Sequence, residues 1–169
     1  TFLHIETAIE CAKNGYHLFL EKPIDLNIQR LPELLKIIEE KKITSYVAYN
    51  LRFHPIIREL KKFFNNNKFL HLRILSSSYL PNWRPGQNYR KGYSSYKEKG
   101  GGVLLELSHE IDYCNYLLGS DIKLFSTHGR QSKLTISAED YADISVQSAI
   151  GPGNIHLNFF SHKKERKIN

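Results

Sequence analysis

A charged pair directly follows an apolar run that is predicted to be a buried strand. The run covers residues 16–20, and Glu21, Lys22 and Pro23 come next. Ligands of open α/β sheets bind beyond the carboxyl ends of the strands, so the Lys22 ammonium is predicted to face a ligand and polarise its hydroxyl or carbonyl. Pro23 restricts Lys22 to extended geometry and permits a cis bond. The alternative is a surface Glu-Lys pair ahead of an ordinary turn proline.

A second group of reactive side chains lies in the stretch GGGVLLELSHEIDY, residues 100–113. The three glycines allow the backbone to approach another group closely, and the helix after them carries Glu106, His109 and Asp112. Each carboxylate is three positions from His109, so either could orient the imidazole or raise its pKa. His109 is a candidate proton donor or acceptor, unless it is only a paired histidine on an exposed helix face. No third ligand stands at a convincing spacing, so we expect no metal site.

The stretch YNLRFHP, residues 49–55, follows the second apolar strand of the chain. Asn50 and Arg52 are therefore predicted to share the sheet edge of Lys22, where Arg52 could hold a phosphate, carboxylate or hydroxyl. In the alternative interpretation, Asn50 makes a turn and His54 caps the next helix.

A long loop, residues 78–99, is rich in aromatic and cationic side chains. It contributes Trp83, Arg84, Tyr89 and Arg90, a mixture suited to stacking on a sugar or closing over a ligand. Loops at subunit interfaces have a similar composition, so this feature alone does not identify a binding site.

The order of predicted elements changes near Asn50. Helical spacing of apolar residues predicts helices at 2–14, 31–41, 55–64 and 103–118, and apolar runs predict strands at 16–20, 45–50, 69–77, 123–129, 141–149 and 154–160. Strands that alternate with helices imply a parallel sheet, and later strands without intervening helices imply an antiparallel one. We therefore expect an α/β chain in two domains. Residues 1–50 would be the C-terminal part of a Rossmann-like parallel sheet, and 51–169 an α+β domain with a mostly antiparallel open sheet.

Composition excludes several classes of protein. The 169 residues are 41% hydrophobic and 24% charged, and no apolar run reaches the roughly 18 residues of a membrane span. The net charge of +7 is spread over helix faces and the 163–167 tail, so we expect no nucleic-acid partner. Cys11 and Cys114 have no CxxC spacing and no secretory signal is apparent, which favours reduced thiols in a cytoplasmic protein.

Three motifs in this order, the segment ending in LEKP, the strand end YNLRFHP and the helix GGGVLLELSHEIDY, resemble the Gfo/Idh/MocA family of NAD(P)-dependent oxidoreductases. The resemblance covers essentially the whole chain. It implies that Lys22 lies beside the nicotinamide and the substrate hydroxyl. The family helix usually carries an aspartate four residues before its histidine, whereas Glu106 and His109 are three apart here. Candidate catalytic residues are Lys22, His109, Glu106 and Asp112. Candidate cofactor-binding residues are Glu21, Lys22, Pro23, Asn50 and Arg52. Candidate substrate-binding residues are Arg52, Trp83, Arg84, Tyr89, Arg90 and His109.

The resemblance also implies what the intact protein does. Family members begin with a strand, a glycine-rich phosphate turn and an acidic residue, and no such turn precedes Glu21, so we expect this chain to be the middle of a longer enzyme. That enzyme would transfer hydride between NAD or NADP and a secondary alcohol or ketone of a sugar, nucleotide-sugar or cyclic polyol. A homodimer or homotetramer through the open sheet is implied. The rival is a non-catalytic fragment that acts as a binding or oligomerisation module.

Overall fold

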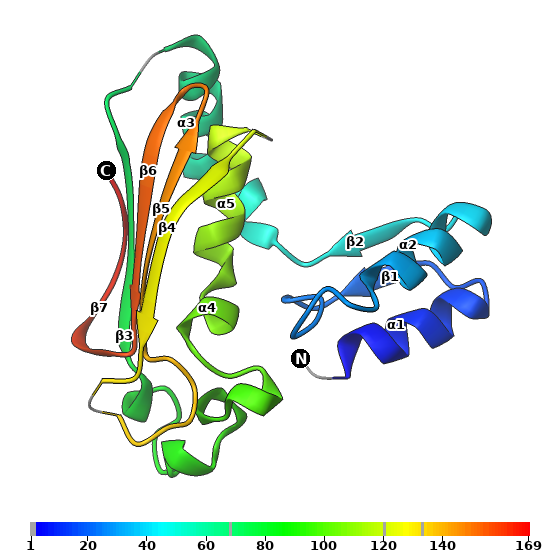
Figure 1. The fold of residues 1–169 in the computed structure, drawn as a ribbon, viewed down its shortest axis with the longest axis horizontal. Coiled ribbons are helices and arrows are strands. Elements are labelled where there is room, and N and C mark those ends of the chain that lie inside the picture. Colours follow the sequence, from blue (N-terminus) through cyan, green and yellow to red (C-terminus); the bar gives the residue numbers. More distant parts are fainter. Residues whose placement is uncertain (1–2, 68, 120, 133) are drawn as a thin grey trace.

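A computed structural model describes residues 3–67, 69–119, 121–132 and 134–169. Its first elements form a small lobe, which projects from the rest of the molecule (Figure 1). The lobe contains α1 (His4–Lys13), β1 (Leu18–Leu20), α2 (Leu31–Glu40) and β2 (Ser45–Val47). β1 and β2 pair in parallel, as predicted, with Leu18 opposite Ser45. Phe2, where the first predicted helix begins, lies outside the described residues.

The small lobe has its own apolar core. Buried residues recur on one face of α1 at helical spacing, and they pack on single residues of β1, α2 and the turn before β2: Ile5, Ala8, Ile9, Ala12, Leu18, Leu34 and Ile43. Gly15, at φ +81°, takes the left-handed conformation that follows many helix ends. The short β1 packs against this core through Leu18, whereas Phe19 on its other face is 75% exposed, and its carboxyl end leads to Glu21.

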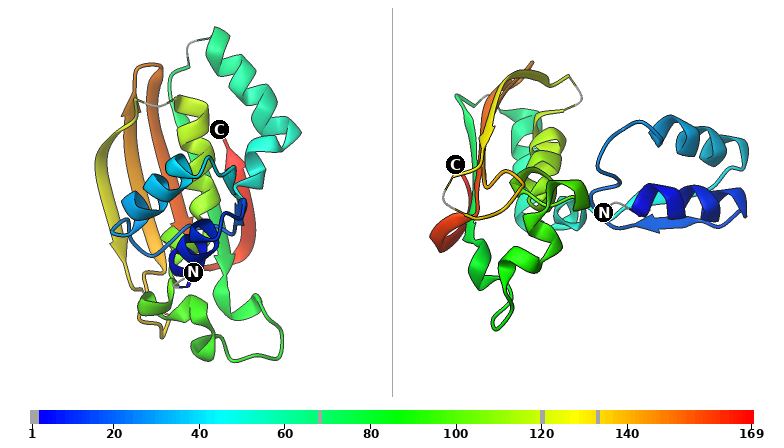
Figure 2. Two further views of the ribbon diagram at one scale, coloured as in Figure 1. Left: turned by 90° about the vertical axis from the view of Figure 1, so that its right-hand side faces the viewer. Right: turned by 60° about the horizontal axis from the view of Figure 1, so that its bottom comes forward.

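The remaining elements form a large lobe, in which three helices lie on one face of a five-stranded sheet (Figures 1 and 2). The strands are β3 (Leu72–Tyr79), β4 (Lys123–Arg130), β5 (Tyr141–Ser148), β6 (Gly151–Asn158) and β7 (Phe160–Ile168), and the helices are α3 (Pro55–Asn66), α4 (Val103–Glu106) and α5 (Ser108–Leu118). The sheet order is β4-β5-β6-β3-β7, with β3 and β6 the parallel pair. This confirms the predicted α/β fold class with a mostly antiparallel sheet.

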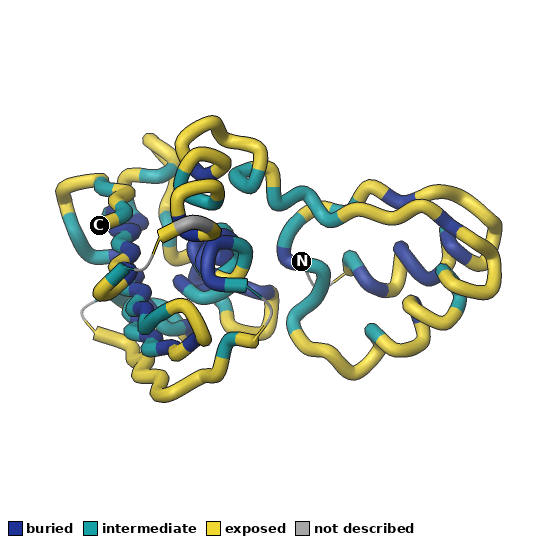
Figure 3. The backbone as a smooth tube through the Cα atoms, turned by 90° about the horizontal axis from the view of Figure 1, so that it is seen from above, coloured by how far each residue is buried: buried dark blue, intermediate teal, exposed yellow. Residues whose placement is uncertain are grey.

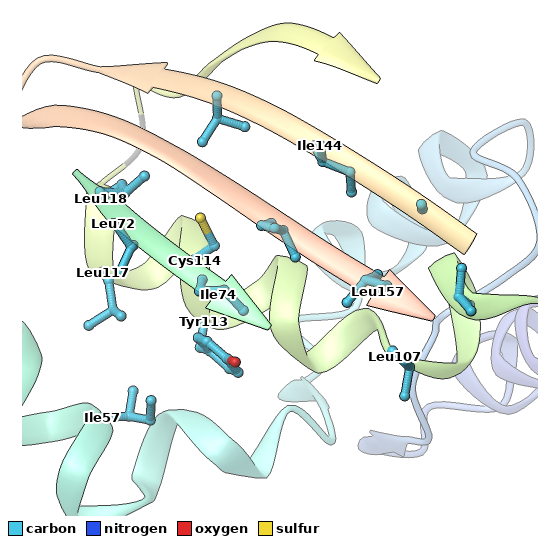
Figure 4. Close-up of a cluster of buried hydrophobic side chains, with 14 of the residues drawn as sticks. Ile57, Leu72, Ile74, Leu107, Tyr113, Cys114, Leu117, Leu118, Ile144 and Leu157 are labelled. Atoms are coloured by element: carbon cyan, nitrogen blue, oxygen red, sulfur yellow. The ribbon is translucent and has the colours of Figure 1, made fainter. Parts of the chain in front are cut away.

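The large-lobe core lies between α5 and the sheet, and Figure 3 shows buried positions in both lobes. Tyr113 and Leu117 of α5 face Leu72 and Ile74 of β3 (Figure 4). Cys114 is buried in the same layer, and burial raises the pKa of its thiol to about 12. None of the described helices is long and apolar enough to cross a membrane.

Several parts of the chain differ from the prediction. The predicted helix 103–118 is interrupted at Leu107, whose φ of −101° and ψ of 29° separate α4 from α5. The charged tail 163–167 belongs to a strand, β7, which pairs antiparallel with β3. The predicted strand 45–50 ends at Val47, and a 3-10 turn, Asn50–Phe53, follows. The loop 78–99 contains four short 3-10 turns, at Leu80–Asn82, Tyr89–Lys91, Tyr93–Ser95 and Lys97–Lys99.

The glycine run before α4 packs against one of these turns. A Cβ atom on Gly101 would lie 2.7 Å from the carbonyl oxygen of Tyr93 and closer still to that of Ser94. Because these are backbone atoms, Gly101→Ala is expected to lower the free energy of unfolding by about 1–3 kcal/mol in a urea titration. Gly129→Ala is the control, since its Cβ would lie 3.4 Å from the nearest atom. Equal stability of the two variants would contradict this account.

Candidate active site

Lys22 connects the two lobes. It follows β1, and its Nζ donates a 2.7 Å hydrogen bond to the backbone carbonyl of Glu106, 84 positions along the chain. Burial lowers the pKa of Lys22, and the carboxylates of Glu106 and Glu110 raise it in part. The ammonium is half-buried and stands at the junction of α4 and α5.

His109 lies near the start of α5, beside this junction. Its Nδ1 atom is buried and has no hydrogen-bond partner among the described residues, and the ring meets Tyr49 edge-on at 5.7 Å between centroids. Burial lowers the pKa of His109, and the charges of Lys22 and Arg166 lower it further. The imidazole is therefore neutral at neutral pH, the form that accepts a proton. The structure brings Lys22 and His109 to one site.

The two carboxylates predicted to orient His109 have other partners. Asp112 accepts two hydrogen bonds from Arg52, at 2.8 Å from Nε and 2.5 Å from Nη2. Glu106 Oε1 accepts from the Ser94 hydroxyl at 2.6 Å. In the described part of the chain no hydrogen bond joins either carboxylate to His109. Their role as partners of the imidazole stays a prediction, and the geometry gives Asp112 a different task, holding Arg52 against α5.

Glu110 was not among the candidate site residues. Its side chain is fully buried, and its Oε1 accepts a 2.6 Å hydrogen bond from Nε of Arg166 on β7. The other oxygen, Oε2, has no partner among the described residues. A signal was present in the sequence, because Glu110 shares the helix face of Tyr113, Cys114 and Leu117, at spacings of three, four and seven. A charged residue on that apolar face requires a partner.

The remaining cofactor-binding candidates differ in their burial. Glu21 and Asn50 are exposed, whereas Pro23 is buried. The Lys22–Pro23 bond is cis, and the Pro23 carbonyl lies 2.8 Å from Nδ1 of His4. Pro23 also lines a cavity of about 640 Å³ together with Tyr49, which lies just after β2, and Ser108 of α5.

The candidates on the loop 78–99 line two neighbouring cavities. Trp83 and Arg84 line one of about 790 Å³, and Tyr89 and Arg90 line one of about 620 Å³. Trp83 is fixed by a 2.9 Å hydrogen bond from its Nε1 to the Ser78 hydroxyl. The guanidinium of Arg90 lies over the Tyr89 ring, 5.6 Å from its centroid.

The alternative role considered for His54 is observed. Its Nδ1 accepts a 3.3 Å hydrogen bond from the backbone N–H of Ile56 and caps α3. Among residues 3–67, 69–119, 121–132 and 134–169, no three His, Cys, Asp or Glu side chains gather as the ligands of a metal would.

The burial of His109 predicts a dependence of stability on pH. The folded-state pKa lies below the ordinary value of 6.5, so as the pH falls through 6.5 the unfolded chain binds a proton before the folded one does. The free energy of unfolding should therefore fall as the pH drops below about 6.5. His109→Gln is expected to make this fall shallower in urea titrations, and His71→Gln, at an exposed position, is the control. An unchanged slope in His109→Gln would contradict the prediction.

Comparison with known proteins places the chain in a protein family. The model of the GFO/IDH/MocA C-terminal domain matches residues 57–168. An inositol 2-dehydrogenase of Rhizobium meliloti is 26% identical over 163 residues, 94% of this chain and 47% of that protein. A levoglucosan dehydrogenase of Pseudarthrobacter phenanthrenivorans is 29% identical over 119 residues, 70% of this chain and 32% of that protein.

Solved structures show the same fold. The WlbA dehydrogenase of Bordetella pertussis, in complex with NADH and UDP-GlcNAcA, superimposes with a TM-score of 0.85 at 22% identity, over 98% of this chain and 53% of that one. The chain thus spans between about a third and about half of the length of these relatives.

Proposed function

We propose a function from one premise: the chain belongs to the GFO/IDH/MocA family, whose C-terminal domain model it matches over residues 57–168. The intact protein is an NAD(P)-dependent dehydrogenase. It interconverts a secondary alcohol and a ketone on a sugar, nucleotide-sugar or cyclic polyol. Relatives named as inositol and levoglucosan dehydrogenases support this substrate class, and the bound NADH of the WlbA structure supports the cofactor.

A single contact carries the proposal. The 2.7 Å hydrogen bond from Lys22 to the Glu106 carbonyl holds a cation from the end of β1 beside His109. A cation next to a neutral imidazole suits the oxidation of an alcohol, because the ammonium stabilises charge on the oxygen while the imidazole accepts its proton. In this role Lys22 touches the substrate oxygen, and Arg52, whose charge is balanced by Asp112, would offer its remaining N–H donors to the ligand.

The residues present fit the reacting end of a nicotinamide dinucleotide. His109 Nδ1 and Ser108 Oγ are buried without partners among the described residues, so polar atoms are free to meet a ligand beside Lys22. NAD or NADP, when bound, supplies the hydride chemistry. Glu21, Pro23 and Asn50 would line its path along the gap between the lobes. The sequence before β1 holds one glycine, Gly15, and does not contain a glycine-rich turn of the kind that binds phosphates.

The wider organisation is also proposed. Residues 1–50 would complete a dinucleotide-binding domain, and 51–169 would form the catalytic and oligomerisation domain of a cytoplasmic enzyme. All eight positions of β4 are exposed, with Leu124 and Phe125 at 64% and 82%, which supports a homo-oligomer that covers this edge.

Calorimetric titration with NAD(H) and NADP(H) tests the proposal, on this chain and on a form extended at its amino end. Binding by the extended form alone, together with reduction of the cofactor when inositol or an aldose is added, is the expected result. Absence of cofactor binding in both forms would instead favour the non-catalytic module.

A further inference from the structure

We propose that the substrate carries an anionic group, a carboxylate or a phosphate, which binds in a cationic hollow next to the candidate active site. This inference rests on the proposed function and specifies its substrate class. The hollow, called the anion pocket below, is the cavity of about 790 Å³ between β3, β7 and the loop 78–99. Its lining includes Ser76, Trp83, Arg84, Leu107, Lys164 and Arg166.

The anion pocket lies directly beside the proposed catalytic pair. Leu107 follows Glu106, whose carbonyl accepts the hydrogen bond from Lys22. Arg166, which also lines the pocket, is bonded to Glu110, the neighbour of His109 in α5. In the proposed complex, a sugar whose hydroxyl meets Lys22 and His109 extends a substituent past Leu107 toward the pocket.

Positive charge in the anion pocket is not balanced. Arg84 contacts the ring of Tyr93, with its Cζ 5.3 Å from the centroid, and neither Arg84 nor Lys164 has a carboxylate partner among the described residues. The single acidic residue of the lining, Glu165, is held at 2.7 Å by both Lys163 and Lys167.

Arg166 adds no uncompensated charge, because Glu110 neutralises it. Two cations therefore face the hollow without a counter-charge, and a ligand anion would supply one. Two unpaired cations on a flat, solvated surface would not by themselves indicate a bound anion. Here the two converge on one cavity from different segments, Arg84 from the loop and Lys164 from β7.

The pocket also has a fixed aromatic wall. The Trp83 ring is held by its hydrogen bond to Ser78 and by an edge contact with Phe159, at 4.9 Å between centroids. An indole held at both ends presents a face on which a sugar ring can lie. The lining is also polar, since it includes the buried residues Ser76, Ser77 and Ser78 of β3. The aromatic wall and the polar lining suit a hydrated, charged sugar better than an apolar ligand.

Equilibrium titration tests the anion pocket without requiring turnover. The chain is titrated with glucose, glucuronate, glucose 1-phosphate and inorganic phosphate, followed by amide NMR. We expect at least one anionic sugar to bind about tenfold more tightly than glucose, with shifts at the pocket residues. Glucuronate and glucose 1-phosphate distinguish a carboxylate from a phosphate, and inorganic phosphate shows how much binding needs the sugar.

The variant Arg84→Gln/Lys164→Gln is expected to abolish this tenfold preference. Lys36→Gln/Lys41→Gln, which removes two charges from the small lobe, should keep it. The inference is overturned if glucose binds as tightly as both anionic sugars, if neither anion binds, or if the pocket variant keeps its preference. Cofactor titration of the extended form is independent of these results, so failure of the anion pocket and failure of the dehydrogenase proposal are distinguishable.

Discussion

Lys22→Ala is expected to lower kcat of the intact enzyme by roughly 10²–10⁴-fold while changing its stability little. The substitution costs the folded state little free energy but removes a group that acts in the reaction. The folded state loses one hydrogen bond, from Nζ to the Glu106 carbonyl, which typically contributes about 1 kcal/mol. The reaction loses the group that stabilises charge on the substrate oxygen and assists its proton transfer, an effect of about two to four orders of magnitude.

Steady-state turnover and urea titration of the same preparation separate these effects. Lys13→Ala is the matched control, because Lys13 lies in the same lobe and pairs with Glu33 at 3.2 Å on the surface. It should leave both turnover and stability near wild type. Lys22→Arg keeps the charge but changes its shape, so partial activity is expected. Wild-type turnover in Lys22→Ala would remove Lys22 from the mechanism.

The position of Lys22 at the carboxyl edge of the small sheet could be anticipated from a simple rule, whereas its place next to the substrate site was implied by the family resemblance. Both Glu21 and Asn50 follow apolar strands, and parallel strands end at a common edge. The glycine run at 100–102 indicated a close backbone approach, which the structure shows against the turn Tyr93–Ser95. The fold class followed from the change in element order. The chemical roles of these residues remain predictions.

Other contacts could not be anticipated, for physical reasons. The segment 160–168 has little apolar alternation, since β7 is an edge strand whose lysines remain in water, so its sequence resembles a solvated tail. The break at Leu107 involves neither glycine nor proline, and helical spacing continues across it. The pairing of Asp112 with Arg52 depends on where the 3-10 turn at Asn50–Phe53 places the guanidinium, which is a tertiary property.

Arg166→Ala is expected to cause the largest loss of stability, about 3–5 kcal/mol in the free energy of unfolding. The substitution removes the partner of Glu110, whose side chain has 0% exposure. A buried carboxylate with one oxygen already unpartnered would then have no hydrogen-bonded counter-charge and would keep only its through-space interaction with Lys22. Arg30→Ala is the control, because Arg30 pairs with Glu33 at 3.0 Å where both side chains are more than 40% exposed. That surface pair should contribute less than about 1 kcal/mol.

Removing Glu110 should lower the free energy of unfolding less than removing Arg166 does. Removing Glu110, as in Glu110→Leu, frees an arginine whose side chain is 50% exposed and can turn into water, so the loss should be less than half that of Arg166→Ala. Replacing both, Glu110→Leu/Arg166→Leu, should recover most of the stability, because no charge is left without a partner. Urea titrations of the four proteins measure this order. Equal losses for the two single variants would show that Glu110 is not held as a buried charge, and that β7 is attached to α5 by packing alone.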